Sequence, residues 1–194
     1  MQEKYMLVYG LKGDRKNIFE RVSDERQFGI RYIEDHELDK KVHELLDGQT
    51  HEVPSDFVMD KDLGDDFEYV LFVNIKDDDL YGFIKDLKEE GIYIPHKAIL
   101  TKMNVNWPLI FLMNENKEEH KVMTLFGRLR NLMQMGAQAY EETGDEELKN
   151  LLIESEEYFH PREFEIEELS EVYNKLAIKL NKLKAEKNGE QYGD

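Results

Sequence analysis

The 194-residue chain contains no cysteine. Disulfide bonds, thiolate catalysis and cysteine-ligated zinc are therefore excluded. Positive charge is also scarce, because 26 lysine and arginine residues stand against 43 aspartate and glutamate residues, which gives a formal net charge of −17. Nucleic acids and anionic membrane surfaces attract basic proteins. The composition thus argues against nucleic acid and against a membrane as partners.

The chain also lacks long hydrophobic runs, since none approaches the ~20 apolar residues that a membrane-spanning helix needs. The first residues, Met1-Gln2-Glu3-Lys4-Tyr5, lead directly into a strand-like segment. They show neither the basic stretch nor the apolar core of a signal peptide. We therefore expect a soluble, cytoplasmic protein, and its 40% hydrophobic residues are enough to form a core.

Short apolar segments alternate with helix-like segments along the first part of the chain. The expected strands are residues 5–9, 28–33, 69–73 and 98–100. This order predicts a three-layer α/β domain over residues 1–115, with a four-strand, mostly parallel sheet and helices on both faces. Tyr5–Tyr9 and Tyr69–Val73 are the most continuously apolar, so they should be the central strands. An antiparallel arrangement stays open, although no two-residue hairpin turn favours it.

After about Glu118, hydrophobic residues repeat every three or four positions. They do so over residues 122–139 and 166–183, and a shorter helix is expected between Gly144 and Pro161. We expect an all-helical region of three helices over residues 116–187, followed by a frayed tail at 188–194. Residues 141–171 are acidic and 174–187 are rich in lysine, so the last helix should fold back along an acidic neighbour.

The apolar faces of these helices have two interpretations. They can pack against each other within one chain, or they can form a coiled coil with a second copy or a protein partner. Phe126, Met133 and Met135 lie outside the heptad seam of the first long helix. The apolar face is therefore broader than a hairpin needs, and some of it should remain for a partner or for self-association.

A polar turn follows the fourth expected strand, in the sequence Lys-Ala-Ile-Leu-Thr-Lys-Met-Asn-Val-Asn-Trp of residues 97–107. This stretch includes the only tryptophan of the chain. Ligands of α/β proteins usually bind beyond the carboxyl ends of parallel strands. The residues just beyond the four expected strands should therefore converge on one crevice; these are Gly10, Glu34, Asn74 and Thr101.

The candidate ligand-binding residues are Thr101, Asn104, Asn106, Asn74, Lys97 and Trp107. Structural alternatives stay open for several of them. The asparagines can simply bond neighbouring backbone and stabilise the turn. Trp107 can act as a plug between the sheet and the helix that begins at Trp107-Pro108.

Other motifs point to ordinary structure. The turn Gly10-Leu11-Lys12-Gly13 follows a strand and could cradle a phosphate, but it lacks both the dinucleotide and the phosphate-loop patterns and reads as a plain turn. Asp77-Asp78-Asp79 lies where a helix should begin, where carboxylates are favoured by the helix dipole. We therefore predict no catalytic residue, no metal site and no cofactor.

The pattern of residues 97–107 resembles the bacterial domain-of-unknown-function 3783 family. The resemblance covers about residues 68–123 and includes the strand Tyr69–Val73 and the run Glu118-Glu119-His120. It implies an α/β fold and a position for a site, without an established chemistry. Met103 and Pro108 stand where the family usually has threonine. The loss of two polar side chains favours a structural or recognition role over a tightly specified catalytic centre.

These observations favour a protein that is not an enzyme and that binds a protein partner or a second copy of itself through its helical region. The alternative is a small-molecule-binding or enzymatic α/β domain, with its site at the carboxyl ends of the parallel strands.

Overall fold

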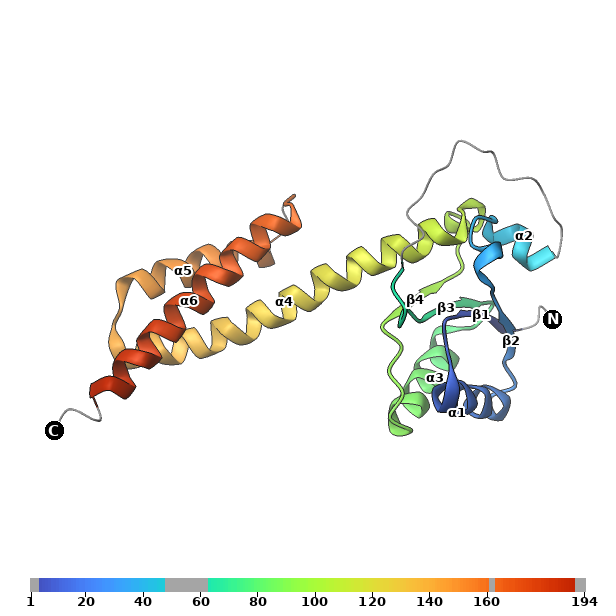
Figure 1. The fold of residues 1–194 in the computed structure, drawn as a ribbon, viewed down its shortest axis with the longest axis horizontal. Coiled ribbons are helices and arrows are strands. Elements are labelled where there is room, and N and C mark those ends of the chain that lie inside the picture. The colour runs from blue at the N-terminus through green and yellow to red at the C-terminus, as the bar shows by residue number, and fades with distance from the viewer. Residues whose placement is uncertain (1–3, 48–62, 161–162, 191–194) are drawn as a thin grey trace. The chain divides into compact units, whose positions relative to one another are not determined.

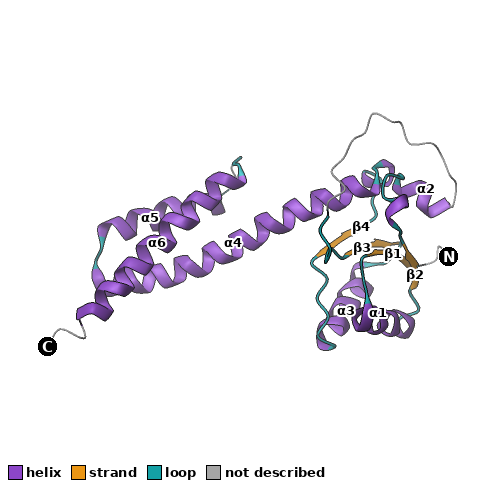
Figure 2. Ribbon diagram, in the orientation of Figure 1, coloured by secondary structure: helices purple, strands orange, loops and turns teal. Residues whose placement is uncertain are grey.

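The computed structural model of the protein describes residues 4–47, 63–160 and 163–190. The chain divides into two compact units, Met1–His120 and Lys121–Asp194. The first unit contains a sheet and helices, whereas the described part of the second is helical (Figure 2). One long helix, α4 (Leu109–Thr143), begins in the first unit and ends in the second.

The sheet of the first unit has four strands. They are β1 (Tyr5–Tyr9), β2 (Gly29–Tyr32), β3 (Tyr69–Val73) and β4 (His96–Ile99), in the spatial order β2-β1-β3-β4. The prediction that the first and third strands are central is confirmed. All five residues of β3 are buried, as are the three inner residues of β1. Their continuously apolar sequences therefore reflect burial on both faces of the sheet.

The sheet is mixed, with two parallel pairs joined by one antiparallel pair. β1 pairs in parallel with β2, and β3 with β4, but β1 and β3 are antiparallel, with Tyr9 opposite Tyr69. The mostly parallel sheet is thus confirmed. The expectation that all four carboxyl ends share one crevice is wrong. Gly10 and Glu34 follow β1 and β2 at one edge, whereas Asn74 and Thr101 follow β3 and β4 at the opposite edge.

Helices α1 (Gly13–Glu25) and α3 (Asp77–Glu89) cover one face of the sheet and lie side by side (Figure 1). Phe19 of α1 and Phe83 of α3 meet edge to face, with ring centroids 5.4 Å apart. The salt bridge from Arg26 Nε to Asp86 Oδ2, 2.5 Å long, also joins the two helices. This layer encloses the first hydrophobic core of the unit.

The other face is covered by a 3-10 turn (Asp35–Glu37), the short helix α2 (Val42–Asp47) and the first turns of α4. Leu45, Leu109 and Met113 pack there against the sheet. Helices on both faces confirm the three-layer architecture. The hydrophobic pattern of residues 38–46 predicts one amphipathic helix, but the structure forms the 3-10 turn and the shorter α2 in this part of the chain. The polar sequence of residues 49–66 predicts a loop, and most of these residues lie outside the described part of the structure.

The second unit contains the end of α4, α5 (Glu146–Glu156) and α6 (Ile166–Glu190). Their apolar faces meet in one core, around Leu129, Leu148 and Leu176. Lys175 of α6 bonds to Glu154 of α5, so the predicted return of the last helix along an acidic neighbour is confirmed. The helix continues to residue 190, into the part expected to be frayed. Among the described helices, none is both long and apolar enough to cross a membrane.

Candidate functional site

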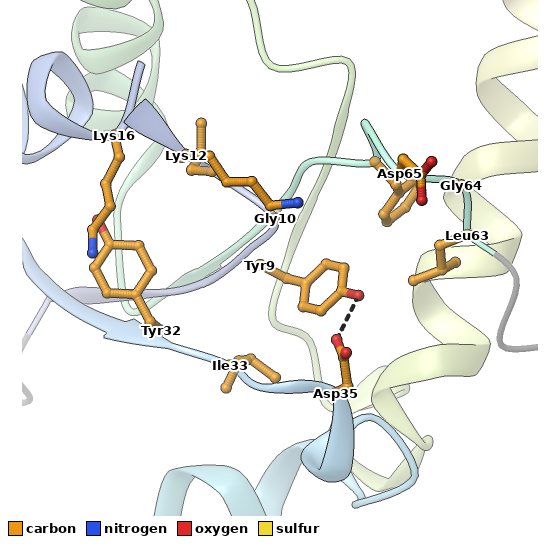
Figure 3. A pocket seen from close by; sticks show the side chains of 12 residues that line it. Tyr9, Gly10, Lys12, Lys16, Tyr32, Ile33, Asp35, Leu63, Gly64 and Asp65 are labelled. Atoms are coloured by element: carbon orange, nitrogen blue, oxygen red, sulfur yellow. Dashed lines mark hydrogen bonds between the residues drawn. The ribbon is translucent and has the colours of Figure 1, made fainter. Parts of the chain in front are cut away.

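A cavity of about 510 Å³ opens at the carboxyl ends of β1 and β2 (Figure 3). The chain leaves these neighbouring parallel strands toward opposite faces of the sheet, into α1 after β1 and into the Asp35–Glu37 turn after β2. Connections that diverge in this way leave a crevice beyond the strand ends, which is the usual ligand position in α/β folds. The cavity is lined by residues 9–12, 16, 32–33, 35, 63–65 and 67.

A tyrosine–carboxylate pair lies inside this crevice. The Tyr9 hydroxyl donates a hydrogen bond to Asp35 Oδ1 at 2.9 Å (Figure 3). Burial, the bond to Asp35 and its negative charge together raise the pKa of Tyr9. The phenol therefore stays protonated and continues to donate to Asp35. Asp35 itself is exposed, so its carboxylate can also accept a hydrogen bond from a ligand.

Two lysines from the start of α1 contribute positive charge. The Lys16 ammonium lies 4.2 Å from the centroid of the Tyr32 ring and 3.8 Å from Glu20 Oε1. Tyr32 also donates to Glu20 at 3.0 Å, so three contacts hold Lys16, Glu20 and Tyr32 together. Lys12 is exposed and forms no ion pair with any residue that the structure describes. Its ammonium is therefore available to an anion in the crevice.

The segment that leads into β3 forms the opposite wall. Gly10 has a φ of +80°, and a Cβ placed there would lie 1.9 Å from the carbonyl oxygen of Phe67. Only glycine therefore allows the end of β1 to approach this backbone so closely. The Phe67 ring lies 6.4 Å from the ring of Tyr9. Asp65, on the same wall, is exposed and forms no ion pair within the described structure.

An arginine fixes the first turn of α1 against β3. Arg15 Nε donates to Glu68 Oε1 at 2.7 Å, and a second guanidinium nitrogen donates to Glu68 Oε2 at 2.5 Å and to the Tyr93 carbonyl at 2.8 Å. Glu68 is nearly buried, so this bidentate contact is better shielded from water than a surface ion pair. It positions the turn that carries Lys12 and Lys16. The crevice as a whole combines two lysines with two aspartates, Asp35 and Asp65.

The predicted site residues beyond β4 form a compact turn at the opposite edge of the sheet. Asn104 is only 8% exposed; its Nδ2 donates to the Ile99 carbonyl at 3.0 Å, and its Oδ1 accepts from the Thr101 backbone at 2.8 Å. Thr101 Oγ1 accepts from the backbone N–H groups of Met103 and Asn104. The structure thus shows the hydrogen bonds to neighbouring backbone that are expected if Asn104 and Thr101 stabilise the turn. Asn106 is exposed, and ligand binding at this turn stays a prediction.

Asn74 and Lys97 belong to the same half of the sheet. Asn74 follows β3 with a φ of +56° and is exposed at the edge where Thr101 follows β4. The Lys97 ammonium donates to the Ile94 carbonyl at 3.0 Å and lies 5.3 Å from the centroid of the Tyr93 ring. Burial lowers the pKa of Lys97. The Lys97 side chain therefore contacts the segment before β4 and not the turn beyond it.

Trp107 packs in the way that the plug interpretation describes. Its ring meets the Phe111 ring edge to face, with centroids 5.0 Å apart, and it contacts the core between the sheet and α4. Its carbonyl accepts a hydrogen bond from the Val42 backbone at 3.0 Å, which ties α2 to the start of α4. Trp107 thus connects three elements of this layer.

Sequence reasoning placed the candidate site beyond β3 and β4, whereas the cavity lies beyond β1 and β2, at the opposite edge of the sheet. The turn Gly10-Leu11-Lys12-Gly13 was visible as a loop after a strand, and it now contributes to the crevice. Tyr9 and Asp35 are 26 positions apart, and no spacing rule links them. Within the described residues, no three histidine, aspartate or glutamate side chains gather as metal ligands.

Comparison with known proteins gives one match. No curated protein and no solved structure is significantly similar to the chain. A family model described as Domain of unknown function (DUF3783) matches residues 68–123, which run from the start of β3 through α3 and β4 into α4. The match confirms the resemblance seen at residues 97–107. Residues 68–123 are thus similar to the DUF3783 family, and this match covers less than a third of the 194-residue chain.

Proposed function

We propose that this protein binds a small polar molecule with an anionic group in the crevice beyond β1 and β2. The observation that supports this proposal is the cavity of about 510 Å³ at the point where two neighbouring parallel strands send the chain to opposite faces. Ligand pockets typically enclose about 300–1,000 Å³ and combine apolar walls with a few convergent polar groups. Leu11, Ile33 and Phe67 supply the apolar part of a lining that is mainly polar here.

The charges of the crevice favour a ligand that carries donors as well as an anion. Lys12 and Lys16 can bind a carboxylate or phosphate, and Asp35 can accept from a hydroxyl or ammonium group. The chain as a whole carries a formal charge of −17. Its field repels anions at long range, although salt screens charges beyond about 8 Å at physiological ionic strength. Binding of an anion therefore depends on the lysines in direct contact.

Partner binding through the helical unit is a second candidate. Large apolar side chains are exposed there on all three helices: Met123 and Met135 on α4, Ile153 on α5 and Ile178 on α6. The three helices nevertheless bury most of their apolar faces in their own shared core. The cavity therefore supports ligand binding more strongly than the exposed apolar side chains support partner binding. We put ligand binding in the crevice forward as the first function.

The proposal can be tested by following backbone amide shifts while glycerol 3-phosphate is added, with glycerol as the matched neutral molecule. We expect saturable shifts at the residues around Gly10, Ile33 and Asp65 with the phosphate ester, and none with glycerol. Replacing Lys12 and Lys16 by alanine should abolish these shifts. Lys76→Ala changes an exposed lysine at the start of α3 and should leave them intact.

Two results would contradict the proposal. Shifts that do not saturate indicate nonspecific association, and equal shifts in the lysine variants show that the crevice is not the site. Mass spectrometry of small molecules retained on protein purified from its native host provides a second test, because it does not depend on the chosen probe.

A further inference from the structure

Three buried side-chain atoms, two on strands of the sheet and one on α4, have no hydrogen-bond partner among the described residues. They are the hydroxyl of Tyr69, Nδ1 of His96 and Oδ1 of Asn116. Native proteins satisfy nearly all buried polar atoms, because a buried group without a partner has lost its hydrogen bonds to water. Three such atoms in one region therefore require an explanation.

The three residues are neighbours in the fold. Tyr69 of β3 and His96 of β4 are direct partners in the parallel ladder, so their side chains project from the same face. Both rings stack on Phe67, with centroid distances of 6.4 Å for Tyr69 and 4.5 Å for His96. The His96 ring also hydrogen-bonds to the backbone of Asn116. Helix α4 therefore carries Asn116 directly to His96.

The protonation state of His96 determines what its free nitrogen can do. Burial, together with the nearby His120, lowers the pKa of His96, so the ring is neutral near pH 7. A neutral imidazole has one N–H donor and one acceptor nitrogen. Because Nδ1 has no partner, the N–H that donates to the Asn116 backbone is on Nε2. Nδ1 is therefore an acceptor that needs a donor.

The two other atoms complete the pattern. Asn116 Oδ1 is an amide oxygen and can only accept hydrogen bonds. Burial raises the pKa of Tyr69, so its hydroxyl keeps its proton and can donate. Together the three atoms present two acceptors and one donor. A molecule that binds to all three atoms must therefore donate two hydrogen bonds and accept one.

We propose that a single ordered water molecule binds between Tyr69, His96 and Asn116. It donates to His96 Nδ1 and to Asn116 Oδ1, and it accepts from the Tyr69 hydroxyl. Buried waters typically make about three hydrogen bonds, to polar groups that otherwise have no partner. A metal or ammonium cation fits less well, because it gives the Tyr69 proton no acceptor.

The change in melting temperature on Tyr69→Phe shows whether the water is bound, because its sign differs between the hydrated and the dry site. If the water is bound, Tyr69→Phe removes one of its hydrogen bonds, and the melting temperature of the first unit should fall by roughly 2–4 °C. If the site is dry, the same change removes an unsatisfied hydroxyl, and the melting temperature should rise. Tyr81→Phe is the matched control, because Tyr81 is 73% exposed and the change should have little effect.

A crystal structure at about 1.5 Å resolution gives the direct test. We expect a density peak at hydrogen-bond distance, roughly 2.7–3.2 Å, from all three atoms. Absence of this peak would overturn the proposal, as would a direct side-chain bond between Tyr69 and Asn116. A peak with the short, multiple contacts of a metal ion would identify a bound cation and would also contradict the proposal.

Discussion

The close approach of Gly10 to the backbone of Phe67 gives a sharp test of how the crevice is built. Gly10→Ala places a methyl group 1.9 Å from the Phe67 carbonyl oxygen at a φ of +80°. A left-handed conformation costs a residue with a Cβ roughly 1–2 kcal/mol. The lower entropy of the unfolded alanine variant offsets about 0.4–1 kcal/mol of this cost.

The steric clash adds a second cost. The contact is with backbone, so the wall of the crevice must move, and overpacking of this kind costs about 1–3 kcal/mol. We therefore expect Gly10→Ala to lower the free energy of unfolding of the first unit by roughly 2–4 kcal/mol. The displaced wall should also weaken the binding of any crevice ligand.

Gly13→Ala is the matched control for this experiment. Gly13 also has a positive φ, +56°, but nothing lies within 4 Å of its added Cβ. It should show only the conformational cost, about 1 kcal/mol. Urea unfolding followed by fluorescence isolates the first unit, because the only tryptophan, Trp107, belongs to it. Equal losses in the two variants would refute the close approach of Gly10 to Phe67.

Four further predictions follow from the same structure. Asn104→Ala should cost about 1–3 kcal/mol, since it removes two hydrogen bonds of a buried side chain, whereas exposed Asn106→Ala should cost little in the same urea assay. Burial lowers the pKa of His96 below its usual 6.5, so the unfolded chain binds a proton more readily than the folded one. The stability that neutral His96 confers is complete above pH 6.5 and is lost as the pH falls toward its folded pKa; urea unfolding at several pH values should show a weaker acid dependence for His96→Gln. In the helical unit, Leu148→Ala should cost about 2–5 kcal/mol by circular dichroism and exposed Ile153→Ala far less. Self-association stays a prediction, and light scattering at micromolar concentration tests it: a strictly monomeric mass would show that the helices satisfy one another.

The sequence was sufficient to predict the position and type of most elements. Buried strands and amphipathic helices have distinct periodicities, and these located β1, β3 and the three helices of the C-terminal region. The central positions of β1 and β3 followed from their continuous apolar sequences. These properties depend on residues that are close together in the chain, which is why one sequence was enough.

Strand direction could not be obtained in this way. A buried strand has the same apolar pattern whether it runs parallel or antiparallel to its neighbour, so the sequence of β3 does not record its orientation. Direction depends on where the connection from β2 returns the chain. The described part of that connection contains only a six-residue helix, α2, in place of the expected longer one. The cavity therefore lies beyond β1 and β2, at the edge opposite to Thr101 and its neighbours.

The antiparallel seam between β1 and β3 has a consequence for the boundaries of the family domain. Residues 68–123 include β3 but not β1, although Leu7 of β1 lies opposite Leu71. A fragment with these boundaries would present one side of a fully buried strand with its backbone groups unpaired, which promotes aggregation. The matched segment is thus smaller than the unit that folds in this chain. The partner strand β1 comes from outside the matched segment, so a fragment meant to fold has to include it.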